Sequence, residues 1–345
     1  MAFLDGYKYA AFLSFVAFTV FSTSVADNAS SHSTAFLHPE SKFRQVRKFH
    51  PVRKTGGFSY SPEPTVALDY HFGPVMTGRN DVIKMFVIYY GHFSRKQKRV
   101  LSHFFKSFSQ NETQELHKPT TEKWWGLTRQ YVDLYETPVA ARLVYEGEKS
   151  NNYSLGASLN QSDIQTLVVK SLESFGASSR SMYLVLTSED VLVERFCQNV
   201  CGTHFFTFPS DATNDQMLPY AWIGNPAKQC PEICAWPYAP GGFLKEGLIP
   251  PNGDAGIDGM IITVANLLAA MGTNPFGNGY YREDGLAAAA VCQGVYGDKA
   301  YSGYPGNLLV DKSTNASFNV YGYKDSKFLV PFMWDPATQQ CALQA

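Results

Sequence analysis

The hydrophobic positions from residue 80 to about residue 200 alternate between two periodicities. Runs of β-branched and aromatic residues predict buried strands at 82–90, 139–145 and 182–186, with a further strand at 220–223. Apolar residues at three- and four-residue steps predict four helices, which cover 95–108, 121–134, 162–175 and 188–196. Ser94 and Ser188 stand where the N-caps of two of these helices belong. Strands that alternate with helices predict an α/β fold.

The segment 258–271 is apolar nearly all round, which predicts a helix buried at the centre of the domain. Asp258 is a natural N-cap, Gly272 stands where a left-handed C-cap belongs, and Pro275 prevents continuation. Asn266 is an interior polar side chain of this helix, and we expect it to be a core amide whose hydrogen bonds are satisfied.

The first 26 residues have the features of a cleavable signal peptide. Lys8 supplies a modest positive charge, residues 9–21 are apolar, and Ser24 and Ala26 are small residues at the −3 and −1 positions of a cleavage site. A membrane anchor is the alternative, but it needs about 20 predominantly apolar residues. We therefore expect secretion, and no later run in the chain predicts a membrane span.

The mature chain divides into a polar arm and one globular unit. Residues 27–64 are rich in Ser, Lys, Arg and His and lack apolar periodicity, so we expect a basic, disordered arm. An electrostatic tether to an acidic polymer and a trimmed propeptide are alternatives to a plain linker. Residues 65–345 share no obvious internal linker and are expected to form a single composite, disulfide-bonded domain.

The chain has six cysteines, and all lie in the carboxy-terminal half: Cys197, Cys201, Cys230, Cys234, Cys292 and Cys341. An even number in a secreted chain predicts three disulfides, and the spacing alone leaves their connectivity open. A zinc site built from the two Cys-x-x-x-Cys pairs is the alternative. Five Asn-x-Ser/Thr sequons mark expected glycosylation sites at Asn28, Asn111, Asn152, Asn160 and Asn315.

Composition and motifs exclude several functional classes. Of 345 residues, 45% are hydrophobic and 17% are charged, and the net charge is −1, so the chain has an ample core and no general attraction to nucleic acid. The sequence lacks a Gly-x-Ser-x-Gly nucleophile turn, a glycine-rich phosphate loop and a His-Glu-x-x-His pair. We therefore assign no catalytic residue and expect no cofactor.

Weaker candidates for chemistry remain. His204 is held beside Cys201, and Asp254 and Asp258 could offer oxygen ligands to a hard cation, although Asp and Gly are also ordinary turn residues. The tryptophans could form a stacking platform for sugars, or they could belong to the core. They are Trp124, Trp125, Trp222, Trp236 and Trp334.

Several motifs in order resemble those of the plant phosphate-induced, or EXORDIUM-like, family. They are Gly73-Pro74-Val75-Met76-Thr77-Gly78, Tyr89-Tyr90-Gly91-His92-Phe93, Trp124-Trp125, Cys201-Gly202-Thr203-His204, Pro251-Asn252-Gly253-Asp254 and Thr273-Asn274-Pro275-Phe276-Gly277. The resemblance covers the chain from about residue 70 to Cys341. It implies a secreted apoplastic or cell-wall protein linked to growth and cell expansion, and it brings no established reaction.

A fainter resemblance concerns the scaffold. The stretch from Asp258 to Pro275 is similar to a segment of metallopeptidase-like proteins that carries a His-Glu-x-x-Glu helix, and those ligand positions fall on Asn266, Leu267 and Ala270. Leucine and alanine cannot bind zinc, so this resemblance implies a degenerate zincin-like scaffold. The leading hypothesis is thus a non-catalytic protein that binds a wall polymer or an extracellular protein. A metal-dependent hydrolase or peptidase acting near His204 and Asp254 is the alternative, and a wall-carbohydrate lectin is a third.

Overall fold

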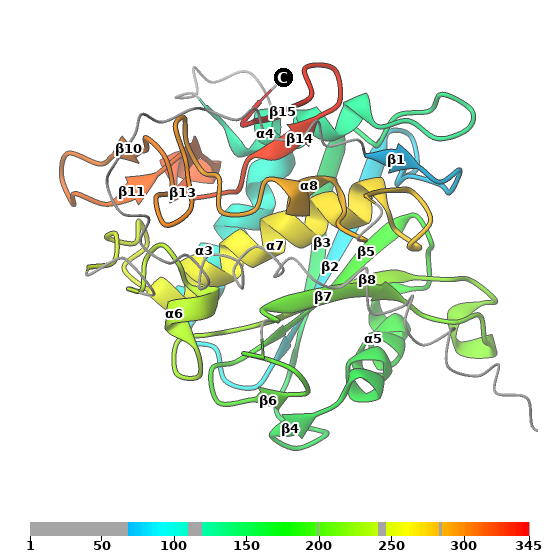
Figure 1. Cartoon of the computed structure of the whole chain (residues 1–345). Coiled ribbons are helices and arrows are strands. Elements are labelled where there is room, and N and C mark those ends of the chain that lie inside the picture. The colour runs from blue at the N-terminus through cyan, green and yellow to red at the C-terminus, as the bar shows by residue number, and fades with distance from the viewer. Residues whose placement is uncertain (1–67, 110–118, 199, 241–245, 283–284, 345) are drawn as a thin grey trace, which may run out of the picture.

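The fold is built on a five-stranded sheet with helices on both faces (Figure 1). The computed structural model describes residues 68–109, 119–198, 200–240, 246–282 and 285–344. The predicted signal peptide and basic arm, together with Asn28 and Asn111, lie outside these described residues. The prediction of an α/β fold is confirmed at the level of a mixed sheet covered by helices.

The strand order of the central sheet is β3-β2-β5-β8-β7. Its strands are β2 (Val82–Tyr90), β3 (Arg142–Asn151), β5 (Ser181–Thr187), β7 (Gly202–Phe206) and β8 (Pro219–Gly224). The first three and β8 run parallel, and only β7, at the edge, is antiparallel to its neighbour. The sequence pattern missed β7, because its five residues begin with glycine and show no apolar alternation.

Side chains of alternate strand residues pack into two separate hydrophobic cores, one on each face of the sheet. Ile83, Met85 and Val87 of β2 pack toward α3 (Arg95–Lys106), α4 (Thr121–Gly126) and α7 (Ala255–Thr273). Phe86 and Ile88 pack on the opposite face, with α5 (Gln161–Phe175) and the cysteines near β7. Burial on both faces explains why these strands read as continuous apolar runs.

Helix starts follow local sequence closely where a capping residue has no competing partner. The Ser94 hydroxyl accepts a hydrogen bond from the Gln97 backbone, and the Gln97 side-chain oxygen accepts one from the Ser94 backbone, which completes a capping box at α3. Asn160 and Asp163 form the same arrangement at α5. Both predicted helices are therefore confirmed within a few residues.

The helix predicted from Ser188 is wrong. The Ser188 hydroxyl donates to the Asp190 carboxylate at 2.6 Å and accepts from the backbone of His92 at 3.1 Å. Its side chain thus joins the ends of β2 and β5 and caps no helix. The chain then forms the short strand β6 (Leu192–Val193), which pairs with β4 (Ser158–Leu159).

Two further elements differ in extent from their predictions. The helix expected over 121–134 ends as α4 at Gly126, and a 3₁₀ turn follows over Leu127–Gln130. Tyr131 then leaves the helical path, because its buried hydroxyl donates to the carbonyl of Trp334 at 2.6 Å. The strand expected over 139–145 is displaced to Arg142–Asn151.

Helix α7 lies across one face of the central sheet (Figure 1). It begins earlier than predicted, because Asp254, whose carboxylate accepts from the backbone of Ile257 at 3.1 Å, is its N-cap. Asp258 lies inside the first turn, and Gly272 lies inside the helix rather than at a left-handed C-cap. By length and composition α7 could cross a membrane, but it is 94% buried within the fold, as expected of a core helix.

Gly272 is required by packing against Trp125. A Cβ at this position would lie 2.9 Å from Cη2 of Trp125, whose ring is held by a hydrogen bond from its Nε1 to the carbonyl of Ala140. Alanine would otherwise favour the helix by about 1 kcal/mol. We expect Gly272→Ala to lower the free energy of unfolding by about 1–2 kcal/mol, because overpacking outweighs propensity.

Gly126→Ala is the matched control for that measurement. Gly126 is the last residue of α4, and a Cβ there would meet nothing within 4 Å. Urea denaturation should show a gain of about 0.5–1 kcal/mol for this variant. A Gly272→Ala protein that is as stable as the parent would contradict the packing argument.

The remaining described strands and helices are short elements around α7, and most of them lie in the last third of the chain. The strands are β1 (Asp69–Tyr70), β9 (Tyr280–Tyr281), β10 (Leu309–Val310), β11 (Ser317–Phe318), β12 (Val320–Tyr321), β13 (Lys327–Phe328), β14 (Met333–Asp335) and β15 (Gln340–Ala342). The helices are α6 (Pro231–Cys234) and α8 (Ala288–Val291). They form two-stranded ribbons, and the Cys292–Cys341 disulfide ties α8 to β15.

Candidate functional site

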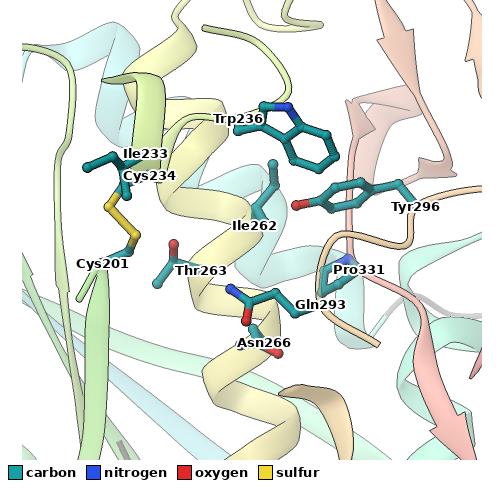
Figure 2. Close-up of a pocket in the computed structure, with 10 residues that line it drawn as sticks. All are labelled: Cys201, Ile233, Cys234, Trp236, Ile262, Thr263, Asn266, Gln293, Tyr296 and Pro331. Carbon is teal, nitrogen blue, oxygen red and sulfur yellow. A yellow bond between two sulfur atoms is a disulfide. The ribbon is translucent and has the colours of Figure 1, made fainter. Parts of the chain in front are cut away.

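A pocket lies beside the middle of α7, next to the edge strand β7 (Figure 2). It is partly open to solvent. Ten residues line it: Cys201, Ile233, Cys234, Trp236, Ile262, Thr263, Asn266, Gln293, Tyr296 and Pro331. From Gly256 onward, Ile262 and Thr263 are the two α7 residues that are not fully buried, so the pocket marks the exposed part of this helix.

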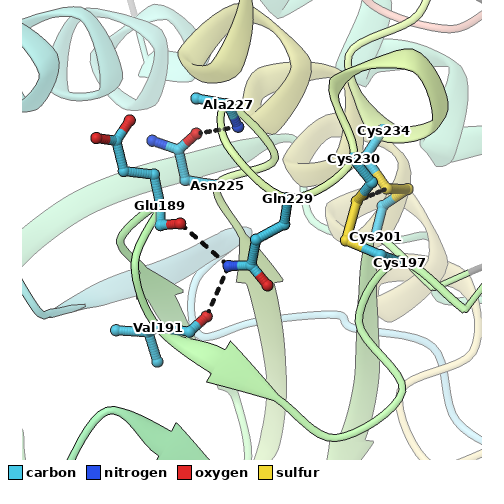
Figure 3. Close-up of a disulfide and its surroundings, with 9 residues drawn as sticks. All are labelled: Glu189, Val191, Cys197, Cys201, Asn225, Ala227, Gln229, Cys230 and Cys234. Carbon is cyan, nitrogen blue, oxygen red and sulfur yellow. Dashed lines mark hydrogen bonds between the residues drawn. A yellow bond between two sulfur atoms is a disulfide. The ribbon is translucent and has the colours of Figure 1, made fainter.

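Two parallel disulfides form one wall. Cys197 pairs with Cys230 and Cys201 with Cys234, so each bridge joins the segment before β7 to α6 (Figure 3). The described cysteines include no free thiol, and the expectation of three disulfides is met. The alternative of a zinc site made from these two pairs is therefore wrong. Only Cys201–Cys234 reaches the pocket.

The segment beside this wall is held by hydrogen bonds between side chains and the backbone. The Gln229 side chain donates to the carbonyls of Glu189 at 3.1 Å and Val191 at 3.0 Å, and the Asn225 carboxamide accepts from the backbone of Ala227 at 3.0 Å (Figure 3). These bonds attach the loop before α6 to the end of β5. The disulfide wall of the pocket is thus fixed before any ligand arrives.

Asn266 and Gln293 each present a buried amide oxygen that has no hydrogen-bond partner. Oδ1 of Asn266 and Oε1 of Gln293 are both buried, and both side chains line the pocket (Figure 2). Asn266 as a whole is 5% exposed. The expectation that Asn266 is a satisfied core amide is therefore wrong.

An unpaired buried polar group is costly. Leaving one without a partner costs about 1–3 kcal/mol, and most buried polar groups in proteins are paired. Two such groups at one pocket are acceptors that a water molecule or a ligand can pair, and two further unpaired groups, the Tyr89 hydroxyl and Nδ2 of Asn274, lie outside the pocket. Thr263 adds a third polar group, and its hydroxyl already donates to the carbonyl of Gly259 at 3.3 Å.

Aromatic rings form the opposite wall. The ring centroids of Trp236 and Tyr296 lie 5.7 Å apart, with 42° between their planes (Figure 2). Of the five tryptophans, Trp124, Trp125 and Trp222 are fully buried core residues, and Trp334 and Trp236 are only 7% and 8% exposed, so the five do not form a surface platform for sugars. Trp236 alone among them lines the pocket.

His204 lies on β7 and faces the far end of α7. It is buried, and its Nε2 contacts the carbonyl oxygen of Asn274 at 3.2 Å. Burial lowers the pKa of His204 to about 4, only partly offset by the hydrogen bond to Asn274. The imidazole is therefore neutral at ordinary pH and serves to join β7 to the C-terminus of α7.

Asp254 and Asp258 lie at the opposite end of the same helix. Asp254 caps it and also accepts from the Gln97 side chain at 3.2 Å. Asp258 accepts two hydrogen bonds from Asn252, and burial raises its pKa to about 7. A helix of 19 residues is about 28 Å long, so the structure does not bring His204 together with either aspartate.

No group of three or more potential metal ligands occurs among the described His, Cys, Asp and Glu residues. Three of the predicted glycosylation sequons can be placed: Asn152, Asn160 and Asn315 are all exposed. Asn160 uses its Oδ1 to cap α5, which leaves its Nδ2 for a glycan. Glycosylation at these sites stays a prediction.

Sequence reasoning did not find most of this pocket. Gln293, Tyr296 and Ile233 come from segments without a recognisable pattern, and Asn266 was noted but assigned to the core. The one sequence feature that pointed to the pocket was Asn266, a polar residue on an otherwise apolar helix. Whether Asn266 belongs to the core or to a pocket depends on whether residues distant in the chain supply a hydrogen-bond partner.

The fold and the pocket define a disulfide-bonded α/β protein with an uncharged pocket beside its core helix. Residues 68–344 match the family model described as the phosphate-induced protein 1 conserved region. The chain belongs to this phosphate-induced protein 1 and EXORDIUM family.

Curated relatives cover most of the chain. Protein PHOSPHATE-INDUCED 1 of Nicotiana tabacum is 39% identical over 298 residues, which is 84% of this chain and 92% of the relative. Protein EXORDIUM of Arabidopsis thaliana is 39% identical over 298 residues, 82% of this chain and 91% of the relative. Protein EXORDIUM-like 2 of the same plant is 37% identical over 297 residues, covering 83% and 93%. No solved structure matches the chain, so the suggested likeness to zincins gains no support.

Proposed function

We propose that this protein is secreted to the apoplast and cell wall, where it takes part in growth and cell-expansion responses by binding a ligand in the Asn266 pocket without converting it. The observation that carries the proposal is the pair of unpaired amide oxygens in a preformed pocket. A ligand that donates hydrogen bonds to them would relieve the cost of burying them.

The extracellular location is supported by independent features. Three disulfides are typical of proteins that mature in an oxidising compartment. The apolar run before Ala26, the exposed sequons and the membership of a plant family agree with that location. We include the domain plan of a signal peptide at 1–26, a basic arm at 27–64 and a globular domain at 65–345 in the proposal.

The chemistry of the pocket favours binding over catalysis. General acid–base catalysis needs a group whose pKa lies near the working pH. Among the described lining residues the polar groups are two amides, the Thr263 hydroxyl and the phenol of Tyr296, whose pKa is raised by burial. The two lining cysteines are joined in a disulfide, so neither supplies a thiolate nucleophile.

Secretion can be tested on the full chain. Expressed in plant cells with a carboxy-terminal tag, the protein should be recovered from the wall fluid with Asp27 as its first residue, because Ala26 ends the predicted cleavage site. Deletion of residues 1–26 should keep it inside the cell. Recovery of uncleaved protein from membranes would contradict this part of the proposal.

The binding role predicts an unusual effect of Asn266→Leu. Leucine is similar in size and removes the unpaired oxygen, so the free energy of unfolding without ligand should rise by about 1–2 kcal/mol. At the same time, retention of the purified protein on isolated plant cell walls should fall at least tenfold. Denaturant titration and a wall-sedimentation assay measure the two effects.

Two controls make the result specific. Asn319→Leu is the same substitution at a buried amide that makes three hydrogen bonds, to Tyr296 and Val330, and it should instead lose about 2–3 kcal/mol. Tyr135→Ala removes an aromatic residue that is 87% exposed and does not line the pocket, and it should leave wall retention unchanged. Full retention of the Asn266→Leu protein would reject this pocket as the binding site.

A further inference from the structure

The pocket specifies what its ligand must carry. The unpaired oxygens of Asn266 and Gln293 are hydrogen-bond acceptors, and the Thr263 hydroxyl, whose hydrogen points to Gly259, also presents lone pairs. All three groups can therefore accept hydrogen bonds from donors on a ligand. A suitable ligand brings at least two O–H or N–H groups with a spacing that spans α7 and the Gln293 segment.

The charge of the lining excludes several kinds of donor. None of the described lining residues has a charged side chain. An anion or an ammonium group would lose its hydration without finding a counter-charge in the lining. Hydroxyl groups are neutral, donate readily and also accept bonds, so they fit this environment best.

The aromatic wall adds a preference for an amphipathic ring. Tyr296 is 1% exposed and packs against Trp236, so the contact open to a ligand is the part of the Trp236 ring, 8% exposed, that lines the pocket, and its negative aromatic quadrupole attracts the slightly positive C–H groups of a saturated ring. A pyranose has such a C–H face and carries hydroxyls around its rim. Ile233 and Ile262 complete an apolar border to the site.

The pocket is partly open to solvent, so one sugar unit of a glycan chain can contact its lining while the rest of the chain remains outside. The rigid disulfide on one side reduces the conformational entropy that binding would cost.

We propose that the pocket binds a neutral sugar unit of an extracellular glycan, with Asn266 and Gln293 accepting hydrogen bonds from its hydroxyls and Trp236 packing against its C–H face. This inference rests on the proposed function, in which the same pocket is the ligand site. It extends that function by naming the chemical class of the ligand.

The test uses purified mature protein and a defined panel of sugars. The neutral probes are glucose, galactose, mannose, xylose and arabinose with their β-linked disaccharides, and the charged probes are galacturonic acid and glucosamine. We expect at least one neutral sugar to bind in isothermal titration calorimetry. Its affinity should fall at least tenfold in Asn266→Leu, in Gln293→Met and in Trp236→Ala, since each removes one group that contacts the sugar.

The outcomes distinguish failure of the sugar proposal from failure of the proposed function, in which the pocket binds a ligand of any kind. Binding of galacturonic acid or glucosamine alone overturns the inference, and so does a panel without any binding while wall retention still depends on Asn266. In both cases the pocket remains the binding site for another ligand. Sugar binding that persists unchanged in Asn266→Leu and Trp236→Ala places the sugar elsewhere and also overturns the inference. Trp236→Phe keeps an aromatic ring and should retain more affinity for the sugar than Trp236→Ala. This variant controls for a loss of sugar affinity that is caused by misfolding.

Discussion

A variant that lacks both Cys197–Cys230 and Cys201–Cys234 is expected to lose about 6 kcal/mol in free energy of unfolding. Each bridge joins cysteines 33 residues apart, and the first closure of such a loop restricts the unfolded chain by about 4 kcal/mol. Once this loop is closed, the second bridge closes only a small ring, made of residues 197–201 and 230–234. This ring adds about 2–3 kcal/mol to the free energy of unfolding. A loss of this size is comparable with the whole stability of many domains.

Single removals should therefore cost less than half as much as the double removal. With either bridge in place the long loop stays closed, so each pair of Cys→Ala substitutions should cost about 2–3 kcal/mol in urea denaturation. Equal costs of about 4 kcal/mol for each bridge, with simple additivity, would contradict the shared-loop argument.

The two bridges also form a matched pair for function. They have the same sequence separation, but only Cys201–Cys234 lines the pocket. Replacing Cys201 and Cys234 should reduce wall retention, whereas replacing Cys197 and Cys230 should preserve it at a similar loss of stability. Equal retention in the two variants would show that the disulfide wall is not part of the binding site.

The sequence predicted those parts of the fold that depend on local chemistry. The strand 82–90 and the helices that follow Ser94 and Asn160 were found because their apolar pattern and capping residues are adjacent in the chain. The helix expected from Ser188 failed for the opposite reason. There the capping side chain is taken by Asp190 and by the backbone of His92, which is 96 residues away.

The pocket could not be predicted, since its defining property is a missing contact. Asn266 would be a satisfied core amide if a donor from another segment reached its oxygen, and nothing within α7 decides this. Likewise, the N-cap predicted from the sequence is Asp258, and the structure has Asp254 in that role. The choice falls on Asp254 because Asn252 occupies the carboxylate of Asp258.

His204 and Asp258 should change the free energy of unfolding with pH in opposite directions, so that their two contributions largely cancel. Burial raises the pKa of Asp258 from 3.8 to about 7, so between these values the folded state holds a proton that the unfolded state has released. Stability from this group falls as the pH rises from 4 to 7, by about 4 kcal/mol. Burial lowers the pKa of His204 from 6.5 to about 4, so the unfolded state binds the extra proton, and stability rises between pH 4 and 6.5 by about 3 kcal/mol.

Single substitutions should reveal the two contributions. We expect the Asp258→Asn protein to become more stable relative to the parent as the pH rises from 4 to 7. The His204→Gln protein should become less stable relative to the parent as the pH rises from 4 to 6.5. Urea denaturation at half-unit steps of pH measures the difference profiles, in which the common surface carboxylates cancel. Because the groups lie at opposite ends of α7, the double variant should equal the sum of the single effects. A His204→Gln profile parallel to that of the parent would mean that the buried imidazole keeps an ordinary pKa, which would require a partner for its charged form beside β7.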